Sequence, residues 1–193
     1  MEKNTKSKNI QFMFNKIAKN YDLMNCIMSF GNHKKWEQEI VQSIKFNSKK
    51  LNKILDIACG TGSLTQEIIK NSPNNNVIGL DFSNAMLSIA KNKVSNLILR
   101  DSHYLPFKKN YFDFVIAIGP VYSLALNDAI KCLKEINRVG KGKSFITLAS
   151  YENRDDYWLF KQWSLLGTTI LRKDEWRKVL NHVNYSGDYS FTN

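Results

Sequence analysis

The chain has 193 residues, and its 43% hydrophobic and 12% aromatic content excludes a disordered protein and suits one domain of ordinary size. The formal charge is +11, but few of the basic residues are arginines, which argues against a nucleic-acid partner. Three widely spaced cysteines, Cys26, Cys59 and Cys132, exclude a disulfide framework and predict no metal site. With no secretion signal and no bilayer-length apolar run, we expect a soluble, cytoplasmic protein.

The first fifty residues predict a helical segment. Apolar residues recur at the spacing of one helix face, at Ile10, Met13, Phe14, Ile17 and Tyr21. After a turn at residues 29–32, a second predicted helix has an apolar side formed by Trp36, Ile40, Val41 and Ile44. This region is also the most basic part of the chain, so it is either a solvated face or a contact for anionic lipid or an acidic substrate.

From residue 51 onward, strand-type and helix-type segments alternate. Short apolar runs predict strands at residues 54–58, 77–81, 97–99, 112–118, 144–149 and 186–193. Helices lie between them, with predicted caps at Ser63 (a capping box with Gln66), Ser83 and Asn127. The pattern predicts a Rossmann-like, doubly wound α/β fold with a mostly parallel sheet and a helical N-terminal lid.

We expect one domain over residues 1–193. Its parts are a lid (1–50), a nucleoside-binding core (51–150) and a C-terminal substrate-side segment (151–193). The oligomeric state has no signature in the sequence.

A glycine turn follows the first predicted strand. Gly60-Thr61-Gly62 lets the backbone approach a ligand closely, and Asp81 ends the next strand, where a carboxylate can accept both hydroxyls of a ribose. A dinucleotide fingerprint would have a third glycine at the position of Thr65. A nucleoside without a pyrophosphate is therefore favoured, and Asp101 and Ser102 after the third strand are placed to hold an adenine edge.

These motifs together resemble the class I S-adenosylmethionine (SAM) dependent methyltransferases over about residues 51–150. The residues that carry the resemblance are the string from Asp56 to Gly62, Asp81-Phe82-Ser83 with Met86, Asp101-Ser102 with Leu105-Pro106-Phe107, and Phe112-Asp113. The resemblance implies that Ala58, Gly60 and Gly62 line the methionine part of SAM and that Phe82 and Met86 flank the adenine. It also places Cys59, and Ile118 at the end of the fourth strand, in the cofactor site.

Several of these residues have a plain packing alternative. Asp56 either braces the glycine turn or touches the ligand, and Cys59 is a small residue that suits a tight place. Phe82 and Met86 could equally be core residues, because aromatic and Met side chains at helix spacing usually pack inward.

The N-terminal segment resembles the entry segment of the ubiquinone and menaquinone biosynthesis methyltransferases. The matching residues are Phe14-Asn15, Ile17-Ala18, Tyr21-Asp22, Asn25, Ser29-Phe30-Gly31 and Trp36. The resemblance implies that this segment closes over SAM, with Tyr21 near the cofactor, and that the methyl acceptor is a polyprenylated ring.

Aromatic residues after the fourth and fifth strands form the predicted acceptor side. They are Tyr122, Tyr151, Trp158 and Trp163, and they follow the strand ends where open sheets bind ligands. His33 and His103 are weak candidates for a general base, because the sequence predicts no side-chain partner that would orient either ring.

The sequence therefore predicts a SAM-dependent methyltransferase of small molecules, with S-adenosylhomocysteine as the product and a quinone-like or other apolar ring as acceptor. Two alternatives stay open. An RNA methyltransferase is one, although Gly119 before Pro120 supplies no side-chain acceptor for a base amine. The other is a SAM-binding regulator or partner subunit without catalysis.

Overall fold

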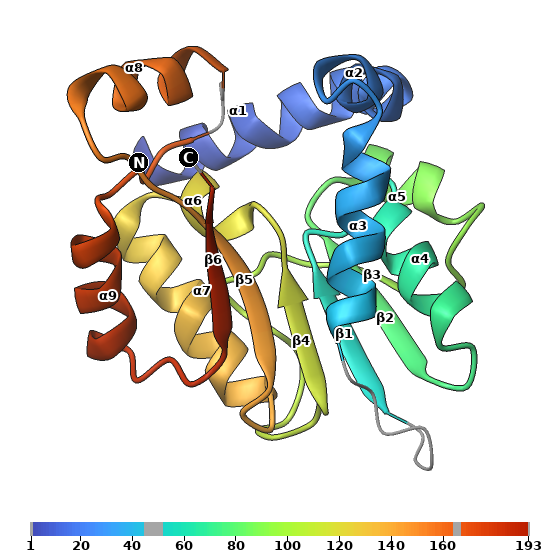
Figure 1. Ribbon diagram of the computed structural model, residues 1–193. Coiled ribbons are helices and arrows are strands. Elements are labelled where there is room, and N and C mark those ends of the chain that lie inside the picture. Colours follow the sequence, from blue (N-terminus) through green and yellow to red (C-terminus); the bar gives the residue numbers. More distant parts are fainter. Residues whose placement is uncertain (1, 45–51, 164–166, 193) are drawn as a thin grey trace. The chain divides into compact units, whose positions relative to one another are not determined.

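The computed structural model describes residues 2–44, 52–163 and 167–192, with only the backbone at residues 2–9 and 163 (Figure 1). The chain divides into two compact units, residues 1–101 and residues 102–193, which are described in turn.

The first unit begins with α1 (Glu2–Ile17), the short 3-10 helix η1 (Ala18–Asn20), α2 (Tyr21–Met28) and α3 (Asn32–Ser43). The sequence predicted one continuous helix face from Ile10 to Tyr21, and this is wrong at its end. The helix tightens into η1 beside α5 (Asn84–Ala90), with Ala18 buried, and Tyr21 starts a new helix. The predicted turn before α3 is confirmed, with Gly31 in the left-handed region (φ 78°).

A parallel sheet forms the centre of the first unit. The strands β1 (Lys53–Ile57), β2 (Asn76–Asp81) and β3 (Leu97–Leu99) lie in the order β3-β2-β1. Ile57 of β1 is paired in register with Leu80 of β2, so both strands end at the same edge of the sheet. Helices α4 (Ser63–Asn71) and α5 pack on β2, and α3 lies beside α4 (Figure 1).

The second unit contains three further parallel strands. These are β4 (Phe114–Ala117), β5 (Ser144–Ala149) and β6 (Asp188–Thr192), with β5 between the other two. Strand β4 is shorter than predicted, because Phe112 forms only an isolated bridge with Gly140. The helices are α6 (Pro120–Ser123), α7 (Leu126–Val139), α8 (Arg154–Trp163) and α9 (Lys173–His182).

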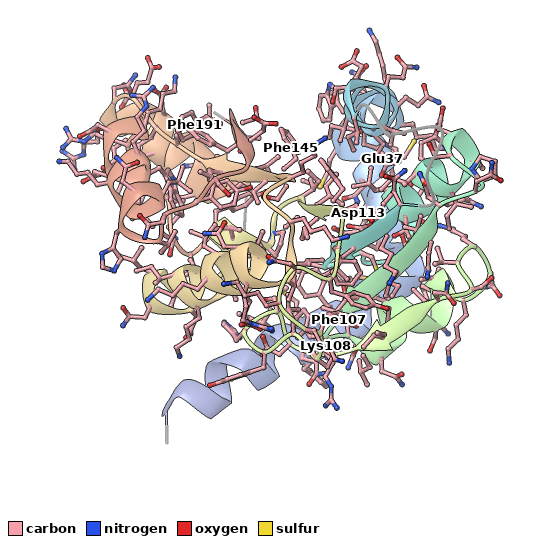
Figure 2. The ribbon with its side chains drawn as sticks, turned by 90° about the horizontal axis from the view of Figure 1, so that it is seen from below. Glu37, Phe107, Lys108, Asp113, Phe145 and Phe191 are labelled. Atoms are coloured by element: carbon pink, nitrogen blue, oxygen red, sulfur yellow. The ribbon has the colours of Figure 1, made fainter. Side chains whose placement is uncertain are left out.

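Side-chain contacts hold the helices of the second unit in place. The amide of Asn137 on α7 donates to the carbonyl oxygens of Val183 and Asn184, directly after α9. Near the start of the unit, Phe107, labelled in Figure 2, meets Phe112 edge to face with ring centroids 4.7 Å apart.

Two of the three predicted helix caps are wrong. Ser83 does cap α5, since its hydroxyl accepts the N–H of Met86 at 3.2 Å. Helix α4, however, is preceded by Gly62 in the left-handed region, and Ser63 lies inside the helix with its hydroxyl bound elsewhere. Helix α7 begins one residue before Asn127, with Ala125 at the N-cap.

The predicted fold class is confirmed. Every strand pair given above is parallel, and helices alternate with strands along the chain, as in a Rossmann-like doubly wound fold. None of the helices within the described ranges is long and apolar enough to cross a membrane. The division into lid, core and substrate-side segment stays a prediction.

Candidate cofactor site

The glycine turn leaves β1 through three left-handed residues. Ala58, Gly60 and Gly62 have φ angles of 59°, 56° and 80°. The N–H of Cys59 donates to the carbonyl oxygen of Leu80 at 3.0 Å, and the N–H of Gly62 donates to that of Cys59 at 2.9 Å. Because Ala58 carries a Cβ in a conformation that favours glycine, the turn is a strained segment held by its hydrogen bonds to β2.

Gly62 is required by close packing as well as by its φ. A Cβ there would lie 3.1 Å from Cβ of Ala90 and 3.2 Å from Cγ2 of Val94. The start of α4 therefore approaches α5 closely.

Cys59 has a packing role. Its Sγ would lie 2.9 Å from a Cβ at Gly79, so the thiol fills the space that the missing side chain leaves on β2. The residue is buried, and burial raises the pKa of the thiol far above its usual range. An inert, buried thiol agrees with the packing alternative given for Cys59.

Asp81 ties the turn to the end of β2. One carboxylate oxygen accepts the N–H of Gly60 at 2.9 Å, and the other accepts the N–H of Ser83 at 2.8 Å. Burial raises the pKa of this carboxyl, against the opposing effect of these backbone hydrogen bonds. A carboxylate has about four lone-pair sites, so Asp81 can hold the turn and still accept a hydroxyl group from a ligand.

The carboxylate of Asp56 binds a side chain of the following helix. Its carboxylate accepts the hydroxyl of Thr65 at 2.6 Å and is 2% exposed, so it links β1 to α4. Of the N–H groups in the glycine turn, that of Gly60 donates to Asp81 rather than to Asp56. Burial raises the pKa of Asp56 to about 7. We do not carry this residue into the proposed cofactor contacts.

Aromatic side chains from the N-terminal helices lie over the turn. Cε1 of Tyr21 lies 4.0 Å from a Cβ built on Gly60, and no other described atom beyond the chain neighbours of Gly60 comes as close. Phe14 meets Tyr21 and Phe82 edge to face, with centroids 6.2 and 5.7 Å apart. Burial raises the pKa of the Tyr21 hydroxyl. Tyr21 therefore lies beside the glycine turn, and its contact with a cofactor stays a prediction.

Two carboxylates on the N-terminal helices bind the turn's hydroxyl groups. Asp22 accepts the hydroxyl of Thr61 and, on its other oxygen, the ammonium of Lys93 at 2.9 Å. Glu37, labelled in Figure 2, accepts the hydroxyl of Ser63 at 2.7 Å. Neither Glu37 nor Lys93 was predicted to have a role at the site. The one available indication was that acidic residues are rare in this basic segment.

The pKa values of these two carboxyls move in opposite directions. Burial acts to raise the pKa of Asp22, but the hydrogen bonds from Thr61 and Lys93 outweigh it and hold the pKa below its usual value. Burial raises the pKa of Glu37 despite the hydrogen bond from Ser63. Asp22 is therefore the more firmly ionised link between the helices and the turn.

The remaining predicted cofactor residues are dispersed. Met86 is 1% exposed, which agrees with its packing alternative, and Asp101 is exposed after β3. Ser102 and Ile118 belong to the second unit, where Ile118 directly follows β4. Their contacts with a cofactor stay predictions.

The two candidate bases, His33 and His103, belong to different units. His33 Nδ1 lies 2.9 Å from the hydroxyl of Ser29, in the turn before α3, and His103 is half-buried in the second unit. A base role for either stays a prediction.

Two of the four predicted acceptor-side aromatics share one cluster. Tyr122 and Tyr151 pack against the buried residues Ala149, Phe160 and Ile170. Trp158 is about half exposed on α8, in edge contact with Tyr157. The side chain of Trp163 lies outside the described residues.

The model of the ubiE/COQ5 methyltransferase family matches residues 2–162. The chain belongs to this family. The demethylmenaquinone methyltransferase of Staphylococcus carnosus is 40% identical over 149 residues, 73% of this chain and 60% of that protein. A ubiquinone/menaquinone biosynthesis C-methyltransferase of Wigglesworthia glossinidia brevipalpis is 39% identical over 125 residues, 60% of this chain. The chain spans 60% and 49% of the lengths of these two relatives.

Solved structures agree on the fold. A SAM-dependent methyltransferase of Thermotoga maritima superposes with a TM-score of 0.66 at 18% identity, covering 89% of this chain and 79% of that one. A putative methyltransferase of Haloferax volcanii gives 0.68 at 17% identity, covering 88% and 75%. At this identity the likeness shows the Rossmann-like methyltransferase fold.

Membership of the ubiE/COQ5 family implies SAM as the cofactor, and the residues of the first unit fit it. Asp81 offers free lone-pair sites at the end of β2, where a ribose would bind. Because residue 60 is a glycine, it places no side chain between the turn and Tyr21. The arrangement suits a nucleoside with a small charged tail.

Proposed function

We propose that this chain is a SAM-dependent methyltransferase that acts on a quinone-like small molecule. The observation that carries the proposal is the pair of hydrogen bonds that the Asp81 carboxylate accepts from the N–H groups of Gly60 and Ser83, because they hold a bare glycine turn beside a carboxylate. The relatives named as demethylmenaquinone and ubiquinone/menaquinone methyltransferases support the choice of acceptor.

When bound, SAM supplies an electrophilic methyl group on a sulfonium. The chain's own part is to bind, orient and exclude water, since an in-line displacement depends mainly on alignment. Asp81 accepts the ribose hydroxyls while its hydrogen bond from Gly60 keeps the turn in place. The nucleoside and the turn are thus fixed by the same carboxylate.

The N-terminal helices exclude water from this side of the site. Phe14, Tyr21 and Phe82 form a continuous set of edge-to-face contacts over the turn. Asp22 and Glu37 hold those helices on the turn through the hydroxyls of Thr61 and Ser63. A dry surrounding strengthens every electrostatic contact to the bound nucleoside.

On the acceptor side we keep Tyr122, Tyr151, Trp158 and Trp163 as the proposed lining. Aromatic walls suit a planar, apolar ring. A ring carbon of a reduced quinone becomes nucleophilic when the neighbouring hydroxyl ionises, and the ring C–H proton must leave after methyl transfer. Both protons need an acceptor, and His33 and His103 stay the candidate bases.

The test is transfer of labelled methyl from SAM to a reduced, prenylated demethylnaphthoquinone, with products divided into organic, aqueous and macromolecular fractions. We expect label in the organic fraction, loss of transfer with Asp81→Ala, and unchanged transfer with the control Asp128→Ala. Asp128 is a suitable control because it pairs with Lys131 on the surface of α7.

Two other outcomes would favour one of the alternative functions. Label that appears only in the macromolecular fraction of a cell extract would replace the small-molecule acceptor with RNA. Binding of SAM by calorimetry without transfer to any fraction would leave the alternative of a non-catalytic regulator or partner subunit.

A further inference from the structure

Helix α2 presents apolar side chains to solvent. None of its residues is buried, although half of them are large and apolar. Leu23 and Ile27 are 61% and 65% exposed, and Phe30, in the turn after the helix, is 93% exposed. We call this set the α2 apolar face; it consists of Leu23, Met24, Ile27, Met28 and Phe30.

The helix geometry explains why these side chains share a face. Tyr21 and Asn25, four residues apart, are the less exposed positions and point toward the rest of the unit. Leu23 and Ile27 are also four residues apart and therefore lie together on the other side. Figure 1 shows α2 at one end of the first unit, between α1 and α3. Exposed apolar clusters of this kind mark interaction sites.

Lysines flank the apolar face along the chain. Lys16 and Lys19 precede α2, and Lys34 and Lys35 lie in the first turn of α3 directly after Phe30. An apolar strip between lysines is typical of helices that lie in the headgroup region of a bilayer.

The acidic residues of this region cancel only part of that charge. Asp22 binds Thr61 and Lys93, and Glu37 binds Ser63. Glu39 lies 3.9 Å from Lys35 in a surface ion pair. The charge left beside the apolar face is therefore positive.

We propose that the α2 apolar face and its flanking lysines dock on an anionic bilayer surface. This inference goes beyond the proposed methyl transfer and does not depend on the identity of the acceptor. A second copy of the chain is a poorer occupant, because a two-fold interface would place the lysines of one copy against those of the other. Anionic headgroups complement both the charge and the apolar strip.

The test is sedimentation of the full chain with vesicles of phosphatidylglycerol and phosphatidylcholine in equal parts, against vesicles of phosphatidylcholine alone. We expect binding to the anionic vesicles, weakened at least about tenfold in L23S/I27S because two exposed side chains lose their apolar burial. The double variant K19E/K34E should lose the preference for the anionic vesicles. L99S/L126S is the matched control, since Leu99 and Leu126 are exposed leucines outside α2.

Calorimetry with SAM on the same samples separates this proposal from the cofactor assignment. Wild type that binds SAM but no vesicles would overturn the docking surface and leave the proposed function standing. Equal vesicle binding by wild type and L23S/I27S would also overturn it. A concentration-dependent doubling of mass that L23S/I27S abolishes would assign the face to a second copy instead.

Discussion

Replacing Asp56 by Asn tests the role of Asp56 apart from that of Asp81, the other buried carboxylate of the site. Asp56 is fully enclosed between β1 and α4, where it accepts the hydroxyl of Thr65. Asparagine keeps an oxygen for this hydrogen bond but cannot ionise. The variant therefore removes a buried charge without removing the bond that links strand and helix.

The size of the effect follows from the pKa of Asp56. Burial raises this pKa from 3.8 to about 7. At a pH between these two values, Asp56 is therefore protonated in the folded protein and ionised in the unfolded chain. Stability consequently falls as the pH rises through this window, and the loss is complete and constant above it. The difference in pKa corresponds to about 4 kcal/mol of unfolding free energy.

The assay is thermal and denaturant unfolding of wild type and Asp56→Asn between pH 4 and 8. We expect the stability of the variant, relative to wild type, to rise by about 4 kcal/mol across this range, or about 10 °C in melting temperature. Any fixed cost of burying the amide is the same at each pH and does not affect this slope. Asp81 and Glu37 titrate in both proteins, so their contribution largely cancels.

The same variant tests the assignment of Asp56 as a supporting residue. SAM affinity by calorimetry should stay within about threefold of wild type, because the carboxylate faces Thr65 rather than the turn. Parallel stability curves for the two proteins would refute the argument from burial. A large loss of SAM affinity in Asp56→Asn would instead return this residue to the cofactor contacts.

Substitutions at three further positions probe the glycine turn and its neighbours. Asp81→Ala should weaken SAM binding at least tenfold, or about 1.4 kcal/mol, since it removes the acceptor of the ribose hydroxyls; an unchanged calorimetric Kd would refute this. Tyr21→Ala should lower kcat while the melting temperature stays close to that of wild type, whereas Tyr21→Phe should keep both values, because the ring edge lies over Gly60. A fall in melting temperature that accounts for the loss of kcat would make Tyr21 a packing residue. Gly62→Ala should destabilise folding by about 2 kcal/mol in denaturant titrations, because its Cβ would crowd Ala90 and Val94 at a positive φ; wild-type stability would contradict that packing.

Local patterns predicted the parts of the site that local chemistry determines. The strand ending at Ile57, the glycine turn and the acid at the end of β2 follow from apolar runs and from the backbone freedom of glycine. Ser83 was predicted as a cap because its hydroxyl needs only a neighbour three residues along the chain.

Contacts between distant segments could not be predicted in this way. Ser63 has the spacing of a capping residue, but Glu37, 26 residues before it, takes its hydroxyl and leaves Gly62 at the N-cap. The sequence also left open whether Asp56 braces the turn or touches the ligand. The answer depends on the register of β1 and β2, which brings Asp81 rather than Asp56 to the N–H of Gly60.

These distant contacts make the turn and the N-terminal helices one structure. Thr61 and Ser63, on either side of Gly62, donate hydrogen bonds to carboxylates on α2 and α3. The N–H of Gly60 donates to Asp81, and Tyr21 lies next to Gly60. A ligand that needs this shape of the turn therefore also favours the packed state of the helices, and by linkage the packed helices favour the ligand to the same extent. Because α2 also carries the exposed apolar face, docking of that face would act on the same helices that cover the cofactor turn.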